Sequence, residues 1–306
     1  MTSICRPNLR FLCLTLAAVV LMAVGVLAQE GAQDKETAAK EAYNEGIQQM
    51  QKGNNDLAIM AFQSAIGNDP NFADAYLNLG VLYFDQGEYD MAAENFRLAS
   101  EKDPKNADAF ANLGKVYLKL RRPAEAEQAL SKAVELQPTN SDLLIELGKI
   151  QYRMRNYGGA ITTLEKAHNQ GGADEYSYYY LGKAYSKQNE NNKAVSAYQQ
   201  ALKIDPKFYS AHFALGSIYL AQEKFQQAAD AFKAALRADP SKATASYNYA
   251  VAIESMNPDN IDANIANWQD YIKKAKKDAR QYKDEIAVAE QHVKDLQERK
   301  EALKYQ

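Results

Sequence analysis

The sequence predicts an all-α solenoid of about seven stacked helix pairs, closed by a C-terminal capping helix. Three regularities predict it. A glycine recurs every 34 residues, an alanine follows each glycine about twelve positions later, and a bulky side chain comes four positions after that alanine. The glycines are Gly46, Gly80, Gly114, Gly148, Gly182 and Gly216. A fixed period of this length marks a stack of similar units, so we do not expect one globular core.

Each unit is expected to hold two amphipathic helices. In the second unit Tyr76, Leu79 and Tyr83 stand three and four positions apart, which places them on one face of a first helix. Ala92 and Phe96 have the same spacing in a second helix. Proline ends that second helix in five units, because it lacks an amide hydrogen and disfavours helix in the residue before it. These prolines are Pro70, Pro104, Pro138, Pro206 and Pro240.

The register sets the expected boundaries. We expect units near residues 39–72, 73–106, 107–140, 141–174, 175–208, 209–242 and 243–275, followed by a C-terminal helix over 276–306. In the fourth unit Gly171-Gly172 replaces the proline, and glycine still ends a helix. The seventh unit is degenerate, because Ala250 replaces the glycine and Trp268 and Tyr271 come two residues late.

This pattern resembles the tetratricopeptide repeat (TPR), whose signature is an aromatic residue or leucine, Leu-Gly, Tyr, Ala, Phe, Ala and Pro at set offsets. The second unit carries it most fully, as Tyr76, Leu79, Gly80, Tyr83, Ala92, Phe96, Ala99 and Pro104. The resemblance covers roughly residues 39–275. It implies a right-handed superhelix of helix-turn-helix units, with the first helix of each unit lining the concave face.

The C-terminal segment allows two interpretations. It contains no glycine or proline, and apolar residues recur in it at helical spacing. A helix that caps the last apolar face is favoured, since terminal repeats need a polar outer side. A coiled-coil partner helix is the alternative, although Lys300 interrupts the apolar pattern.

The N-terminus is typical of a secretory signal. Arg6 and Arg10 precede an uncharged apolar run, and small residues close it at Ala28. We expect residues 1–28 to be a signal peptide, with a retained membrane anchor as the alternative, and residues 29–38 to be a short polar linker. The repeats would then be periplasmic or secreted, or inner-membrane anchored and facing the periplasm.

Removing this leader would change the composition. Both cysteines, Cys5 and Cys13, precede the expected cleavage point, so the mature chain would have no thiol chemistry and no disulfide. Without Arg6 and Arg10 the formal charge would fall from −3 to −5, because no acidic residue precedes Glu30. A mildly acidic chain does not indicate nucleic acid as a partner.

The sequence offers no constellation of residues that indicates catalysis. The histidines His168, His212 and His292 are scattered, without acidic residues at metal-ligand spacing. We find no glycine-rich phosphate loop and no nucleophile motif. We therefore expect no enzyme activity, no cofactor and no metal.

One set of residues is a candidate partner-binding surface. The position after the motif glycine holds Lys115, Lys149 and Lys183 in three consecutive units, and Lys119, Arg153 and Lys187 follow four residues later on the same helix faces. Tyr152, Tyr179 and Tyr180 lie in the same helices and would add flat contact area. The alternative is a solvated face, since lysine is favoured near the end of a helix.

Two functions fit this sequence. The first is a non-catalytic protein-interaction scaffold outside the cytoplasm that assists assembly of a bacterial envelope complex. The second is direct binding of an anionic glycan or acidic peptide in the concave groove. Expected partners are therefore envelope proteins, an acidic peptide or an anionic polysaccharide, with membrane contact only if the leader is retained.

Overall fold

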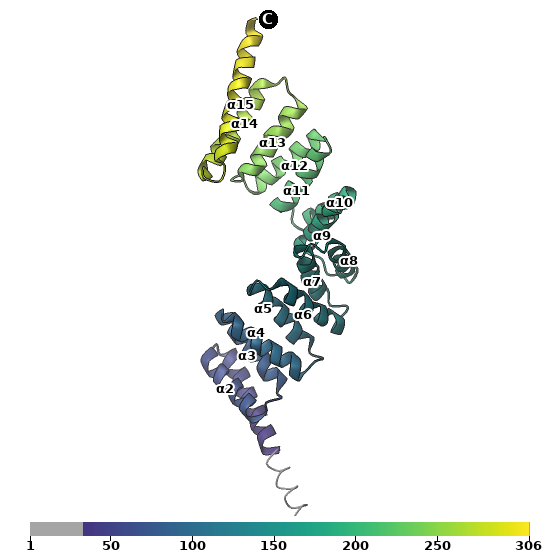
Figure 1. Cartoon of the computed structure of the whole chain (residues 1–306), viewed down its shortest axis with the longest axis vertical. Helices are drawn as coiled ribbons and strands as arrows, with labels where there is room; N and C mark the ends of the chain where they lie inside the picture. The colour runs from purple at the N-terminus through teal and green to yellow at the C-terminus, as the bar shows by residue number, and fades with distance from the viewer. Residues whose placement is uncertain (1–32, 306) are drawn as a thin grey trace, which may run out of the picture. The chain divides into compact units, whose positions relative to one another are not determined.

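The computed structural model describes residues 33–305, and the expected leader lies outside the described residues. Helix pairs follow one another along the chain, and the described residues contain no strand (Figure 1). A helix over residues 33–51 pairs with α2 (Asn55–Asn68). The next pairs are α3 (Ala73–Gln86) with α4 (Tyr89–Lys102), α5 (Ala107–Lys119) with α6 (Pro123–Leu136), α7 (Ser141–Arg153) with α8 (Tyr157–Asn169), and α9 (Glu175–Lys187) with α10 (Asn191–Ile204). The last are α11 (Tyr209–Ala221) with α12 (Phe225–Ala238) and α13 (Ala243–Met256) with α14 (Ile261–Ala275), followed by η1 (Lys276–Asp278), α15 (Lys283–Ala302) and η2 (Leu303–Tyr305).

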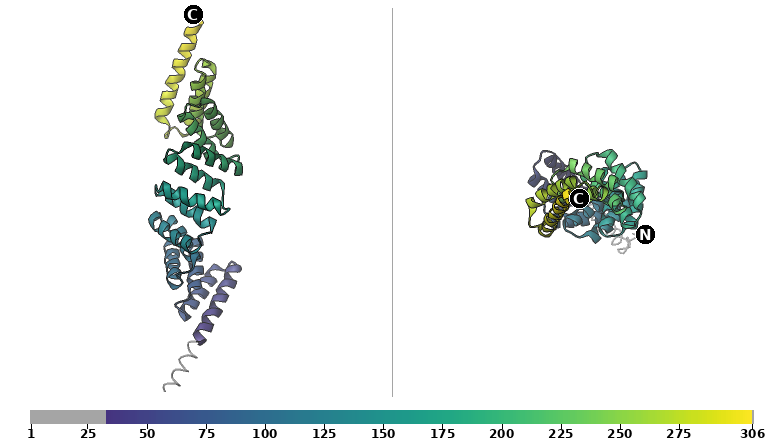
Figure 2. Two further views of the ribbon diagram at one scale, coloured as in Figure 1. Left: turned by 90° about the vertical axis from the view of Figure 1, so that its right-hand side faces the viewer. Right: turned by 90° about the horizontal axis from the view of Figure 1, so that it is seen from above.

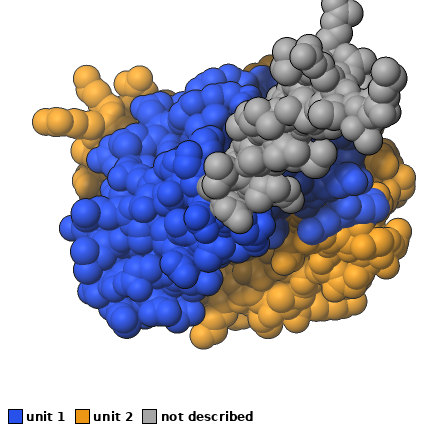
Figure 3. Space-filling model, turned by 90° about the horizontal axis from the view of Figure 1, so that it is seen from below, with its two compact units in different colours: residues 1–138 blue, residues 139–306 orange. Residues whose placement is uncertain are grey.

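The chain forms two compact units, divided after Pro138 (Figure 3). In the first unit each helix from α2 to α6 packs on the next, and buried Phe62, Leu82 and Phe96 belong to one apolar cluster. In the second unit the same order runs from α7 to α15, and Figure 2 shows its helix pairs stacked. The predicted solenoid of stacked pairs is therefore confirmed.

The motif glycine is a point of close approach between the two helices of a pair. A Cβ atom built on Gly80 would lie 2.7 Å from the ring of Phe96, so nothing larger than hydrogen fits there without movement. The same contact joins each motif glycine to the bulky residue sixteen positions later: Gly46 to Phe62, Gly114 to Leu130, Gly148 to Leu164, Gly182 to Tyr198 and Gly216 to Phe232. In each of these pairs a glycine of the first helix faces a bulky residue of the second helix. Close packing of the two explains why both recur in register.

In the first six pairs, the turn between the paired helices contains one residue in the left-handed conformation, again every 34 positions. Gly53 and Gly87 take it in the first two pairs, with φ of 76° and 81°. In the next four pairs the position is held by Arg121, Arg155, Asn189 and Glu223, with φ between 57° and 63°. In the Arg155 turn, the Asn156 N–H donates to Gln151 O at 2.9 Å and the Arg155 N–H to Tyr152 O at 3.0 Å, which is the pattern of a Schellman cap.

The fourth pair ends without a proline. Gly171 takes the left-handed conformation, with φ 84°, and the Gly172 N–H donates to Ala167 O at 3.1 Å. His168 then ties this turn to the next helix, because its Nε2 lies 3.0 Å from the hydroxyl of buried Ser177. That hydroxyl donates to Asp174 O at 2.8 Å, so it accepts the imidazole hydrogen. A glycine cap and a buried hydrogen bond replace the proline.

The last helix caps the solenoid, as predicted. Its apolar stripe, Ile286, Ala289, Val293 and Leu296, is buried in one cluster with α14. In α14, Trp268 and Tyr271 fill the core at 7% and 1% exposure, two residues later than the register of the preceding units. The expected continuous helix is interrupted, since η1 and a short turn precede α15 and reverse the chain onto α14.

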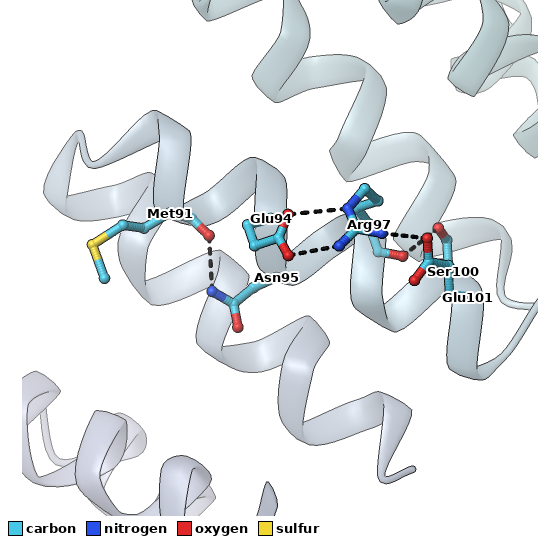
Figure 4. A network of polar contacts seen from close by, with 6 residues as sticks. All are labelled: Met91, Glu94, Asn95, Arg97, Ser100 and Glu101. Atoms are coloured by element: carbon cyan, nitrogen blue, oxygen red, sulfur yellow. Dashed lines mark hydrogen bonds and ion pairs between the residues drawn. The ribbon is translucent and has the colours of Figure 1, made fainter. Parts of the chain in front are cut away.

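Outer helix faces carry ion pairs between side chains one turn apart. On α4, Arg97 donates to the Glu94 carboxylate at 2.6 and 3.0 Å and also pairs with Glu101 (Figure 4). Hydrogen bonds to these carboxylates raise the pKa of Arg97. The pairs are exposed, and such pairs contribute at most about 0.5 kcal/mol each. Glu36 and Lys40 form a similar pair at 2.6 Å. Both residues lie in the first described helix, which begins at residue 33, so residues 33–38 of the expected linker are helical.

Within residues 33–305, no helix combines the length and apolar character that a membrane span requires.

Candidate functional site

A lysine surrounded by tyrosine rings marks the surface of the second unit. The Nζ atom of Lys183 lies 4.8 Å from the ring centre of Tyr152, 5.2 Å from that of Tyr179 and 5.6 Å from that of Tyr180. We call these four residues the lysine–tyrosine cluster. An ammonium at these distances is attracted by the negative ring faces.

Two neighbouring first helices build the cluster. Tyr179 and Tyr180 precede Lys183 by four and three residues in α9, so all three lie on one helix face. Tyr152 comes from α7, which contacts α9 directly. The cluster therefore depends on the stacking of two successive repeats.

The cluster rings contact one another and also contact aromatic residues outside the cluster. Tyr152 and Tyr180 meet edge to face at 5.5 Å. Tyr179 contacts Tyr198 at 5.8 Å and Phe208 at 5.3 Å, and Tyr198 is almost fully buried. Because the supporting rings belong to the core, the orientation of Tyr179 is fixed before any partner binds.

The phenol groups of Tyr152 and Tyr179 are neutral hydrogen-bond donors. Burial raises the pKa of Tyr152, and the neighbouring tyrosines raise it further. Burial also raises the pKa of Tyr179, an effect that a hydrogen bond with Ser210 partly offsets. The surface thus presents one positive charge, flat apolar faces and hydroxyl groups.

The structure treats the six predicted cations differently. Lys149 is paired with Glu146 at 3.0 Å, and 18% of its side chain is exposed. Arg153 and Lys187 are exposed in the last turns of α7 and α9. Of the predicted residues, the structure brings Lys183, Tyr152 and Tyr179 together, while the charge of Lys149 is balanced locally.

The remaining two cations belong to the first unit. Lys115 and Lys119 are exposed on α5. Lys115 lines a pocket of about 170 Å³ together with Phe84 and Asp85 of α3, so an acidic group shares its surroundings. The pocket is mixed in charge and small.

Sequence reasoning placed tyrosines beside lysines but missed their direct contact. The run Tyr178, Tyr179, Tyr180 followed by Lys183 was the available signal, because a cation three or four residues after an aromatic ring lies over that ring on a helix. The three histidines have structural partners: Ser177, the carbonyl of Pro206, and Glu254. Among the described residues, no three His, Cys, Asp or Glu side chains gather as metal ligands would.

Family models match more than half of the chain. Models described as tetratricopeptide repeat match residues 107–140, 179–243 and 215–255, and one described as TPR repeat matches 46–87 and 82–120. No curated protein matches the chain.

Solved structures share the fold. The crystal structure of MamA is 28% identical, with a TM-score of 0.52 over 54% of this chain and 97% of its own. YrrB, described as a TPR protein with an unusual peptide-binding site, is 24% identical, with a TM-score of 0.57 over 61% of this chain and 96% of its own. The pilF protein of Pseudomonas aeruginosa is 22% identical, with a TM-score of 0.54 over 71% and 96%.

TPR proteins act as scaffolds for protein interactions. The glycine register, the helix pairs and the family matches agree, and the chain belongs to the tetratricopeptide repeat family.

Proposed function

We propose that this protein is a non-catalytic scaffold outside the cytoplasm that helps to assemble a bacterial envelope complex. Its partner is an acidic segment of another protein, bound at the lysine–tyrosine cluster. The observation that carries this proposal is the position of the Lys183 ammonium among three tyrosine rings.

The chemistry of the cluster suits an extended acidic peptide. Tyrosine faces give large contact area and lose little side-chain entropy on binding. The Lys183 ammonium is held in place by the rings, so it can donate hydrogen bonds to a partner carboxylate without first being ordered. Arg153 and Lys187 lie exposed at the ends of the same two helices and add positive charge.

YrrB, which shares the fold, is described as having a peptide-binding site. The preference for an acidic peptide follows from Lys183 and its neighbours in this chain.

Crosslinking in the native cells tests the partner. The variant Tyr152→Ala with Lys183→Gln removes the ammonium and the ring from α7, whereas Lys166→Gln removes an exposed lysine of α8 as a matched control. We expect a crosslinked protein partner to be lost in the first variant and kept in the second. Retention of the same partner in both would contradict the proposed surface.

An anionic glycan is the alternative ligand for the same charges. It would appear as salt-sensitive binding of the purified protein to anionic polymers, lost in the same variant, without a crosslinked protein. That result would overturn the scaffold proposal and favour direct glycan binding.

The location rests on Arg6, Arg10 and the apolar run that ends at Ala28. Cell fractionation with N-terminal sequencing tests it. A mature chain that begins at Gln29 in the periplasm or medium is expected, whereas an intact leader in the cytoplasm would exclude export.

A further inference from the structure

A pocket of about 480 Å³ lies at the C-terminal end of the second unit, between α13, α14 and α15. We call it the Trp268 pocket. It is separate from the lysine–tyrosine cluster and shares no residue with it. Its walls come from the degenerate seventh repeat and the capping helix.

Aromatic rings form one side of this pocket and stand nearly perpendicular to one another. Tyr247 and Trp268 meet at 5.2 Å and 82°, and Trp268 and His292 at 5.2 Å and 75°. All three rings line the pocket, and they come from α13, α14 and α15. Aromatic rings carry negative potential on their faces, so a cation is attracted where such a face borders the pocket.

A carboxylate completes the polar side. Glu254 accepts the indole N–H of Trp268 at 2.7 Å and contacts His292 Nε2 at 2.9 Å, which fixes its position. The indole is a neutral donor and leaves the carboxylate charge in place. None of the nine lining residues, all of them in the described part of the chain, is a lysine or arginine.

We propose that the Trp268 pocket binds an organic ammonium ion. Aromatic faces attract a cation whose charge is spread over methyl or methylene groups, and Glu254 supplies the opposite charge. The chain already stabilises one ammonium in this way, since Lys183 lies over three tyrosine rings. At Lys183 the ammonium belongs to the chain itself. At Trp268 the rings and the Glu254 carboxylate border a pocket, which an ammonium from another molecule could enter.

The mouth of the pocket fits the apolar part of such a ligand. Val288 is 69% exposed and Tyr247 is 37% exposed at its rim. An ammonium on a short carbon stem would place its charge near Glu254 and its stem against these two side chains. A choline headgroup and a partner's lysine side chain share this chemistry.

Trp268 is the only tryptophan of the chain, so its fluorescence reports on this pocket alone. The full-length purified protein is titrated at about pH 8 with choline, with the neutral choline analogue that has carbon in place of nitrogen, and with Nα-acetyl-lysine amide. We expect a saturable fluorescence change with at least one of the two ammonium compounds, at about tenfold lower concentration than with the neutral analogue. The compound that binds distinguishes a free quaternary ammonium from a peptide side chain.

A variant separates charge recognition from apolar binding. Glu254→Gln keeps an oxygen for the indole N–H and should weaken ammonium binding about tenfold. Glu298→Gln removes the same charge from an exposed position on α15 and should leave binding unchanged. Equal responses to charged and neutral analogues, or none to either ammonium, would overturn the proposal even if the Glu254 variant does not fold.

Discussion

A Cβ atom built on Gly182 would lie 2.6 Å from Cε1 of Tyr198, closer than side chains approach in folded proteins. Tyr198 is 2% exposed, so its ring is enclosed on the other side as well. The motif glycine is therefore required by its neighbour, because its own backbone is ordinary helix. One contact of this kind joins the helices of each of the first six pairs.

Replacing Gly182 by alanine should destabilise the protein. Alanine gains about 1 kcal/mol of helix propensity over glycine, but overpacking a closed core costs about 1–3 kcal/mol. We expect a net loss of up to about 2 kcal/mol, measured as a lower thermal or urea midpoint. In a Tyr198→Ala background the same substitution should become neutral or stabilising, since the contact is gone.

Gly67 in α2 is the matched control for this prediction. A Cβ there would meet nothing within 4 Å, so Gly67→Ala should stabilise by about 0.5–1 kcal/mol. If Gly67→Ala and Gly182→Ala change the midpoint equally, the contact with Tyr198 is not what selects glycine.

At the left-handed turn positions we expect glycine to stabilise the protein when it replaces the natural residue. The backbone φ angles of Arg155 and Glu223 are 63° and 57°, and both side chains are exposed. This left-handed conformation costs a residue with a Cβ about 1–2 kcal/mol. Glycine removes this cost but loses about 0.5–1 kcal/mol more entropy on folding. Arg155→Gly and Glu223→Gly should therefore each stabilise by about 0.5–1 kcal/mol in chemical denaturation.

Asn189 occupies the same turn position and tests the cause. Asparagine tolerates the left-handed conformation better than arginine or glutamate, so Asn189→Gly should change stability less. Equal effects at all three positions would mean that backbone strain does not distinguish these residues.

The sequence predicted the repeat because its determinants are local and periodic. The contact of Gly80 with Phe96 appears as fixed spacing, and Ala250 with the late Trp268 marked the degenerate unit. The turn at Arg155 was not predicted, since arginine carries no preference for the left-handed conformation. It is imposed there by the stacked helices on both sides.

The candidate site was predictable only in part. Register placed Lys149 and Lys183 at equivalent positions, yet one pairs with Glu146 and the other lies over tyrosine rings. These differences arise from residues three or four positions away and from the neighbouring helix. Glu254 of α13 contacts Trp268 of α14 and His292 of α15. These contacts depend on where the chain reverses before α15, and no repeat pattern specifies that position.

The buried hydrogen bond of His168 predicts a pH dependence. Burial lowers the pKa of His168 in the folded protein below the ordinary 6.5 of an unfolded histidine, against weaker opposing effects of Asp174 and Glu165. Between the two values the unfolded chain binds more protons, so stability is full above about pH 6.5 and falls as the pH drops toward the folded pKa.

His168→Gln removes this titration. The difference in unfolding free energy between the natural protein and the variant should therefore shrink as the pH falls below about 6.5. Denaturation midpoints across this range measure it, and the difference cancels carboxylates common to both proteins. A difference that does not vary with pH would show that His168 titrates alike in both states.

The capping helix should be held by its apolar stripe more than by its ion pairs. Leu296 is 5% exposed in the cluster with α14, so Leu296→Ala should cost about 2–4 kcal/mol of local stability. Arg299 pairs with exposed Asp259 at 2.8 Å, and Arg299→Ala should cost at most about 1 kcal/mol. Hydrogen exchange of the α15 amides measures both, with Val288→Ala, at an exposed position of the same helix, as control. A larger loss of protection in Arg299→Ala than in Leu296→Ala would mean that charge, and not burial, keeps α15 on the last repeat.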